Sequence, residues 1–361
     1  MNFTLKSLVK PLHGPSSCTP QNMRVLFLSA LALALTVRGD VNLRVRADGS
    51  GDYTSVQAAL DSLAPRAGAV GRVTLSLLGV FRERVHIYAN FTDGVALRGA
   101  GAAPTDALVI YNVAGARVGT FASWTMLVEA SNVTLENVAV ANDAGGYNKT
   151  VAGQSVALHV TGDFFVARDA ALLGAQDTLY GGTQRLYLEN VFINGSCDSA
   201  FGEGSIVFDG VASAIYDTVT AHRGEAPPFA ARSAYLFLRS ALRPTGGRST
   251  FLGRPWGALA AVVLIDTELG AGIEPAAWED WGHGCTNATT REKSATWCAN
   301  VTYAEFNSSG VGAAPQSRVW WSSQLSAEEA AAWTPARVLG GWEPAARAAP
   351  AAWRAASLFR V

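Results

Sequence analysis

The sequence predicts an all-β protein: a right-handed parallel β-helix, or solenoid, with short helices near its ends. Two observations lead to this fold class. Amides and carboxylates recur at nearly one interval, since Gln154 and Gln176 are 22 residues apart and Asp177 and Asp198 are 21 apart. Short β-branched and aromatic runs recur at a similar interval, with no helix-length period between them. A unit of strands and polar turns repeated in this way is typical of a solenoid.

The apolar pattern supports the same repeat. Four segments share an apolar residue, two polar or glycine residues and a second apolar residue, namely Leu135–Val138, Ala167–Ala170, Leu188–Val191 and Phe208–Val211. Their first residues are 32, 21 and 20 positions apart. The longest interval contains the Gly-rich polar run from Asp143 to Lys149, which we interpret as a loop inserted into one turn of the solenoid.

The chain begins with a segment of a different character. Met23 and Arg24 precede an apolar run that ends at Val37, and this order is typical of a secretory signal peptide. The alternative is a membrane anchor or a buried helix, but about thirteen residues are short for crossing a bilayer. We therefore expect residues 1–39 to be an extension and signal peptide, residues 40–361 to form one β-helix domain, and the mature protein to be extracellular, without a membrane partner.

The elements expected after the leader follow in order. Val41–Ala47 alternates as a first strand, and Thr54 with Gln57 forms a capping box for a helix that ends near Leu63. This helix would cap the open end of the solenoid. Strands are then expected from Val73 onwards, at Val85–Ile87, Val95–Leu97, Ala107–Tyr111 and Thr125–Val128.

Two features mark the second half of the chain. The repeat weakens between Ala221 and Tyr235, where Arg223–Pro228 is predicted to be a surface loop beside a cleft. Further on, Ser326 and Glu329 form a capping box, so an Ala-rich helix is expected to begin there and to end before Pro335.

Composition excludes some functions. Lys and Arg total 28 and Asp and Glu total 29, so no basic field for nucleic acid is present. After the leader, the chain has seven Asn-X-Ser/Thr sequons, beginning with Asn90, which are typical of an exported glycoprotein. We expect Cys285 and Cys298 to form a disulfide and Cys197 to be a free thiol. The histidines have no metal-ligand spacing, so no metal is expected.

The recurring polar residues form a candidate site. Residues one coil apart in a solenoid lie about 4.8 Å apart, so Gln154, Gln176, Asp177 and Asp198 should converge on one face. Two close carboxylates repel each other, so they are expected only where a cation neutralises them or where the protein uses them in its function. Arg254 is the leading candidate for the cation. The alternative is that the aspartates are turn residues and the glutamines form a stacked amide ladder.

Five motifs in order carry a resemblance to a known family. They are Gly79–Glu83, Gln154–Leu158, Gln176–Leu179, Asp198–Gly202 and Leu252–Trp256, and together they resemble the pectin methylesterases. The resemblance implies a β-helix that removes methyl esters from pectin (homogalacturonan) and releases methanol without a cofactor. It further implies a role in cell wall modification, a monomeric enzyme and a proteinaceous inhibitor as a possible partner.

The resemblance also implies roles for individual residues. Asp198 matches the nucleophile, Asp177 the acid and then base, and Arg254 the residue that orients Asp198. Gln176 and Gln154 match the oxyanion stabilisers. These residue types suit ester hydrolysis, which needs a nucleophile, a proton donor for the alkoxide and hydrogen-bond donors for the oxyanion.

Two further residues are expected to contact substrate, the second because of the resemblance. Trp256 follows Pro255, whose fixed φ restricts its presentation, and a sugar ring can stack on it; the alternative is a core tryptophan. Thr120 matches a threonine that contacts substrate. Glu83, in the first motif, is predicted to be structural.

The sequence departs from the family next to the nucleophile. Ser199 and Ala200 replace two bulky residues, which is expected to loosen the packing of Asp198, and Glu203 replaces an uncharged amide and is expected to raise the pKa of Asp198. Two rival functions therefore stay open. One is a β-helix polygalacturonase or lyase, and the other is a pectin-binding cell wall protein without catalysis.

Overall fold

A computed structural model of the chain describes residues 38–144, 153–247, 249–285 and 298–344. The chain divides into two compact units, Met1–Val37 and Arg38–Val361, and all the described residues belong to the second unit. Nearly all of the predicted signal peptide, and most of the loop predicted at Asp143–Lys149, lie outside the described residues.

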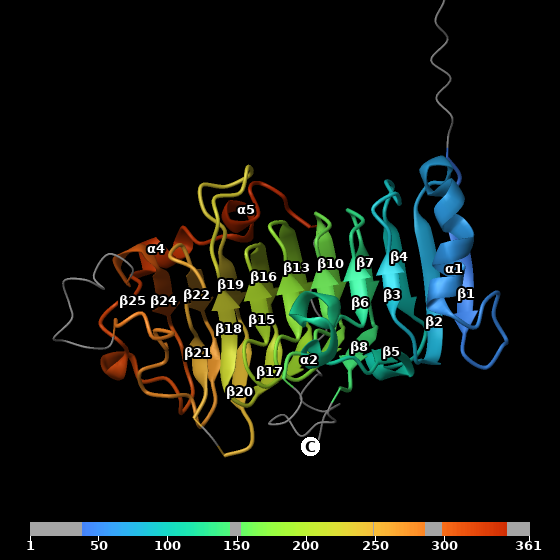
Figure 1. Cartoon of the computed structure of the whole chain (residues 1–361). Coiled ribbons are helices and arrows are strands. Elements are labelled where there is room, and N and C mark those ends of the chain that lie inside the picture. The colour runs from blue at the N-terminus through green and yellow to red at the C-terminus, as the bar shows by residue number, and fades with distance from the viewer. Residues whose placement is uncertain (1–37, 145–152, 248, 286–297, 345–361) are drawn as a thin grey trace, which may run out of the picture. The chain divides into compact units, whose positions relative to one another are not determined.

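The second unit is a parallel β-helix whose strands stack side by side along its length (Figure 1). Three parallel sheets form its walls. Sheet A contains β1 (Val41–Arg46), β2 (Val73–Phe81), β4 (Val95–Gly99), β7 (Thr134–Glu136), β10 (Phe165–Arg168), β13 (Arg185–Glu189), β16 (Ser205–Asp209), β19 (Tyr235–Leu238), β22 (Ala261–Ile265), β24 (Thr302–Phe306) and β25 (Ser322–Gln324). The predicted fold class is confirmed.

The other two walls contain shorter strands. Sheet B contains the end of β2 with β5 (Ala107–Tyr111), β8 (Ala139–Asn142), β11 (Ala171–Leu173), β14 (Phe192–Gly195), β17 (Ala212–Ile215), β20 (Ala241–Pro244) and β23 (Glu268–Leu269). Sheet C contains β3 (Val85–Ile87), β6 (Met126–Val128), β9 (Leu158–Val160), β12 (Leu179–Gly181), β15 (Ala200–Gly202), β18 (Thr218–His222) and β21 (Phe251–Gly253). Sheet C positions the candidate site.

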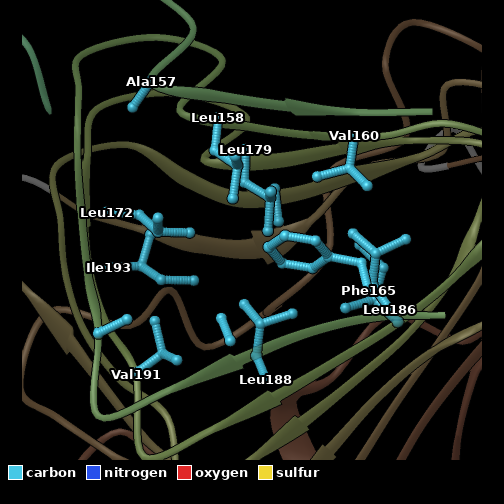
Figure 2. Packing of buried hydrophobic residues seen from close by; sticks show 14 of the residues in the cluster. Ala157, Leu158, Val160, Phe165, Leu172, Leu179, Leu186, Leu188, Val191 and Ile193 are labelled. Atoms are coloured by element: carbon cyan, nitrogen blue, oxygen red, sulfur yellow. The ribbon is translucent and has the colours of Figure 1, made fainter. Parts of the chain in front are cut away.

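The register between coils agrees with the apolar repeat in the sequence. Leu135 pairs with Ala167, Ala167 with Leu188, and Leu188 with Phe208, and all four are fully buried. Figure 2 shows inward side chains of neighbouring coils, such as Leu158 on Leu179, in contact inside the solenoid. The repeat is therefore a stack of core layers, one layer for each coil.

One turn recurs in each coil between sheet A and sheet B. Its left-handed residue, with φ between 47° and 63°, is Asn137, Asp169, Asn190, Gly210, Arg239 or Asp266. Asn, Asp and Gly tolerate this conformation best. The Asn190 side chain also donates to Asp169 Oδ1 at 2.6 Å. Five of these six residues are therefore of the types that the backbone geometry favours.

The first helix differs in detail from the prediction. α1 (Val56–Leu63) is capped by Ser55, whose hydroxyl accepts from the amide of Ala58, and the predicted Thr54 cap is wrong. Glu83 also accepts hydrogen bonds from the amides of Val56 and Gln57 at 2.7 and 3.1 Å. A carboxylate placed at a helix N-terminus satisfies free amides and the helix dipole, so Glu83 is structural, as predicted.

The remaining helices are short. Among the described residues they include η1 (Ala64–Ala69), η2 (Pro104–Asp106), α2 (Gly115–Val118), η3 (Thr120–Ala122), η5 (Pro315–Ser317), α4 (Ala327–Ala331) and α5 (Pro335–Val338). The predicted capping box at Ser326 and Glu329 opens α4, which ends before Pro335. Within the described ranges, no helix combines the length and apolar character needed to cross a membrane.

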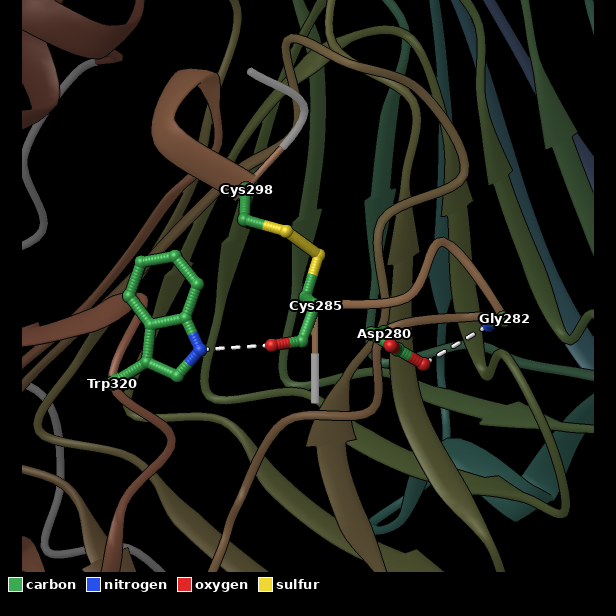
Figure 3. Close-up of a disulfide and its surroundings, with 5 residues drawn as sticks. All are labelled: Asp280, Gly282, Cys285, Cys298 and Trp320. Atoms are coloured by element: carbon green, nitrogen blue, oxygen red, sulfur yellow. Dashed lines mark hydrogen bonds between the residues drawn. A yellow bond between two sulfur atoms is a disulfide. The ribbon is translucent and has the colours of Figure 1, made fainter. Parts of the chain in front are cut away.

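A disulfide joins Cys285 and Cys298 near the C-terminal end (Figure 3). Trp320 donates from its indole nitrogen to the carbonyl of Cys285 at 2.8 Å, and the amide of Gly282 donates to Asp280 at 3.0 Å. The bond from Trp320 joins the segment after sheet C to the chain just before β25, whereas the bond from Gly282 is local to that segment.

Candidate active site

Two buried carboxylates occupy equivalent places in neighbouring coils. Asp177 stands two residues before β12 and Asp198 two residues before β15, and they are only 6% and 3% exposed. Both adopt left-handed backbone, with φ of 66° and 51°. The amide of Asp177 donates to the carbonyl of Cys197 at 3.0 Å. Aspartate tolerates this region better than most residues, so both residues suit the turn that precedes each strand.

Arg254 holds Asp198 from two coils further along. It follows β21 directly and donates from Nε to Oδ1 at 2.9 Å and from Nη2 to Oδ2 at 2.7 Å. Its guanidinium carbon lies 4.0 Å from the centre of the Trp281 ring. Burial lowers the pKa of Arg254, but the hydrogen bonds to Asp198 outweigh burial and raise it above its ordinary value. Arg254 is therefore a permanent counter-charge for Asp198.

Asp177 has the opposite electrostatic environment. Burial, followed by the negative charge of Asp198, raises the pKa of Asp177 to about 8, although Arg254 partly opposes the rise. Neither the loss of hydration nor a like charge favours ionisation. At neutral pH the Asp177 carboxyl is thus protonated and can donate a proton. Two carboxyl groups with separated pKa values are a frequent arrangement in acid–base sites.

The two glutamines lie side by side, one coil apart. Gln154 and Gln176 form a parallel β-bridge outside the strands, and the amide of Ser155 donates to the carbonyl of Gln176 at 2.8 Å. The carbonyl of Gln154 accepts from Gly115 at 2.7 Å. A Cβ atom at Gly115 would approach the Cβ of Gln154 to 2.9 Å, so the absence of a side chain at Gly115 permits this contact.

All seven predicted site residues line one cleft of about 180 Å³ on the outside of sheet C. They are Thr120, Gln154, Gln176, Asp177, Asp198, Arg254 and Trp256. The structure therefore brings together residues spread over more than 130 positions of the sequence. In the described part of the chain, no group of three or more His, Cys, Asp and Glu side chains is arranged to hold a metal ion.

The cleft also contains residues that the sequence analysis did not single out. Phe121, Phe201, Ala221 and Trp281 complete its lining. The Phe121 side chain is 50% exposed, and its ring centre lies 5.2 Å from that of Tyr180. Phe201 belongs to a motif already recognised, and Phe121 follows Thr120. No pattern in the sequence predicted Trp281 at this site, because it lies in the irregular segment after sheet C.

The departures next to the nucleophile have different consequences. Ser199 and Ala200 face the core and line a void of about 10 Å³, which agrees with looser packing beside Asp198. Glu203 accepts hydrogen bonds from Tyr180 at 2.8 Å and from Arg223 at 2.9 Å. Its carboxylate therefore lies beyond the C-terminal end of β15, whereas Asp198 precedes the N-terminal end of that strand.

The cleft contains an oriented carboxylate, a neutral carboxyl group and paired amides. These are the groups that an ester hydrolase needs, here on a β-helix scaffold. Comparison with known proteins identifies which one: the chain belongs to the pectinesterase family, whose description "Pectinesterase" it matches over residues 42–342.

Individual proteins agree with this assignment. Pectinesterase 31 of Arabidopsis thaliana is 30% identical over 304 residues, which are 80% of this chain and 89% of that protein. Probable pectinesterase 67 of the same plant is 28% identical over 339 residues, 91% of each. Pectin methylesterase from carrot has a similar fold, with a TM-score of 0.70 and 23% identity over 83% of this chain and 93% of that one.

Proposed function

We propose that the chain removes methyl esters from pectin with Asp198 as the nucleophile. The observation that carries this proposal is the contrast between Asp198, bound by two hydrogen bonds from Arg254, and Asp177, whose pKa is raised to about 8. One carboxyl is ready to attack and its neighbour is ready to donate a proton, as ester cleavage at neutral pH requires.

The first half of the reaction forms an acyl-enzyme. A carboxylate oxygen of Asp198 attacks the ester carbonyl carbon, and the side-chain amides of Gln176 and Gln154 stabilise the oxyanion. When the tetrahedral intermediate collapses, the bond between carbon and methoxy oxygen breaks. Asp177 gives its proton to the leaving oxygen, so methanol departs and a mixed anhydride with Asp198 remains.

The second half restores the enzyme. Asp177 is now ionised and takes a proton from a water molecule, whose oxygen attacks the acyl carbonyl of the anhydride. The bond to Asp198 breaks, which frees its carboxylate and leaves a galacturonic acid residue on the polymer. Asp177 holds a proton again, as before the first step.

Aromatic side chains suit a polysaccharide substrate. Trp256 and Trp281 border the cleft near Arg254, and Phe121 is half exposed at its edge. Sugar rings present C–H faces that pack on aromatic rings. Thr120 lies in the same cleft and is proposed to contact the substrate.

We further propose that residues 1–39 direct secretion and that the mature enzyme acts on cell wall pectin as a monomer. We also propose that an inhibitor protein can cover this cleft.

The test is methanol release from highly methylated pectin by protein expressed from Asp40 in a secretory host. Asp198→Asn and Asp177→Asn should each abolish most of the release, while Asp48→Asn, at an exposed turn, should not. A fall in pectin viscosity without methanol would indicate chain cleavage, the rival polygalacturonase or lyase activity. Binding of pectin by folded parent protein without turnover would indicate the non-catalytic rival.

A further inference from the structure

A row of side chains borders the cleft next to Phe201 and Trp256, at the end of β15 away from the aspartates. Phe201 pairs with Ala221, and the amide of Arg223 donates to Gly202 at 2.9 Å. The amide of Trp256 donates to His222 at 3.1 Å. Glu203, Arg223 and Trp256 are therefore in register in three successive coils. Glu203 accepts a hydrogen bond from Tyr180, whose ring centre lies 5.0 Å from that of Phe201, so Glu203 lies on the same side as Phe201, which lines the cleft.

Glu203 anchors this row. Its residue is 8% exposed, and its two carboxylate oxygens accept from Tyr180 Oη at 2.8 Å and from Arg223 Nη1 at 2.9 Å. A buried carboxylate that accepts one hydrogen bond from a guanidinium and one from a hydroxyl group is fixed in place. Glu203 therefore determines where the head group of Arg223 lies.

Arg223 is held but still accessible. Its stem packs on Gly257, where an added Cβ would lie 2.8 Å from Arg223 Cγ and 2.2 Å from its carbonyl oxygen. Its guanidinium carbon lies 5.3 Å from the centre of the Trp256 ring. The side chain is nevertheless 48% exposed, and the nearest other acid, Glu225, is itself 45% exposed with its oxygen 3.8 Å from Nε.

Most donors of this guanidinium are unused. Within the described residues, the bond from Nη1 to Glu203 is the one side-chain hydrogen bond that Arg223 donates. The planar guanidinium of an arginine, when its N–H donors are free, binds a carboxylate more specifically than the ammonium group of a lysine does. A guanidinium that is already held in position loses little conformational entropy on binding.

We propose that Arg223 binds the free carboxylate of a uronate residue next to the one being de-esterified, with Glu203 as its positioning residue. The proposal rests on the proposed function and names a specificity determinant of the same cleft. Successive rings of a 1,4-linked uronate chain are rotated about the chain axis, so when one ester faces the aspartates, a neighbouring carboxyl group can face Arg223. Each turnover creates such a carboxylate, and the enzyme would then favour partly de-esterified stretches.

The test compares the parent with Arg223→Met, Glu203→Gln and a matched control, Arg239→Met, which removes an exposed, ion-paired arginine in the turn between sheet A and sheet B. kcat and KM for methanol release are measured on pectins of high and of low methyl-ester content. On the low-ester pectin, Arg223→Met should raise KM about three- to tenfold, the size of a partly exposed charge pair. KM on the high-ester pectin, and kcat on both, should change less than about twofold.

Further measurements separate recognition from structure. Glu203→Gln should raise the same KM less, Arg223→Lys should recover part of the loss, and about 0.5 M salt should remove the difference between parent and Arg223→Met. Arg239→Met should behave as the parent. An equal rise of KM on both pectins, or no rise on either, would overturn the proposal.

Calorimetric binding of a fully de-esterified oligogalacturonate tests the inference without turnover. Weaker binding by Arg223→Met than by the parent supports it, whereas equal affinities or no binding by the parent overturn it. Absence of methanol release by the parent from every pectin would refute the proposed function instead, and the binding result would still decide the role of Arg223.

Discussion

The titration of Asp177 can be measured as a change of stability with pH. Its pKa is about 8 in the folded protein and 3.8 ordinarily. Below about pH 4 the carboxyl is protonated in both the folded and unfolded states, and its contribution to the free energy of unfolding is complete. Between pH 4 and 8 the unfolded chain ionises while the folded site does not, so the contribution declines. Above pH 8 it is lost. Asp177→Asn cannot titrate and removes this dependence.

The expected size follows from the shift. Roughly four pH units at about 1.4 kcal/mol per unit give a loss of about 5 kcal/mol between pH 4 and pH 8. About 300 residues unfold with an entropy of about 0.6 kcal/mol/K. The Tm of the parent should therefore fall by about 8 °C relative to that of Asp177→Asn over this range.

Scanning calorimetry of both proteins at pH 4, 5, 6, 7 and 8 provides the measurement. Asp48→Asn is the control, because hydrogen bonds from Ser50 lower the pKa of Asp48, so its contribution is already complete above pH 5 and the Tm difference from the parent should stay flat. A flat difference for Asp177→Asn as well would refute the raised pKa. The same titration predicts that kcat/KM for methanol release declines above about pH 8, where the proton donor is lost.

Four further changes test other parts of the argument. Arg254→Met leaves a buried carboxylate unpaired and should cost about 3–5 kcal/mol of unfolding free energy, whereas Arg243→Met, at an exposed ion pair, should cost less than about 1 kcal/mol; equal costs in urea unfolding would contradict this. Gln176→Leu should lower kcat about 10²- to 10³-fold with little change in KM if the amide stabilises the oxyanion, and a change confined to KM would assign it to binding. Cys298→Ser should lower stability by about 3 kcal/mol through loss of a 13-residue closure, and the reductant sensitivity of the parent Tm should vanish in this variant. Glu83→Gln should cost about 1 kcal/mol through weaker capping of α1, and hydrogen exchange no faster in Val56–Leu63 would show that the cap is dispensable.

The stacking of the coils could be predicted because it obeys one repeated requirement. Each coil must place an apolar side chain against the equivalent side chain of the next coil, so Leu135, Ala167, Leu188 and Phe208 carried the register in the sequence and pair directly in the structure. Helix capping has no such repetition. Thr54 and the adjacent serine are both residue types that commonly cap helices, so the sequence did not distinguish them. The helix start depended on Glu83, which accepts a hydrogen bond from the amide of Val56 across 27 residues of sequence.

The site could be predicted in its members but not in its boundaries. Asp177, Asp198 and the glutamines recur with the coil, so the period that builds the fold also brings them together. Trp281 follows no period, since it enters from irregular chain after sheet C. Arg223 follows β18 directly, in register with Glu203, but was predicted only as the start of a surface loop. Their positions depend on contacts such as the ring of Trp281 under Arg254 and the close approach of Arg223 to Gly257, which no spacing in the sequence records.

The placement of the two aspartates shows why this scaffold suits the chemistry. Each aspartate stands between a turn and a strand paired in parallel with strands in both neighbouring coils, and this pairing fixes its position. Burying two carboxyl groups side by side is also unfavourable, unless one is paired and the other is protonated. Arg254 fulfils the first condition, and burial, followed by the charge of Asp198, promotes the second by raising the pKa of Asp177. Burial and the close negative charge, which would destabilise an ordinary core, therefore produce the protonation difference on which the proposed reaction depends.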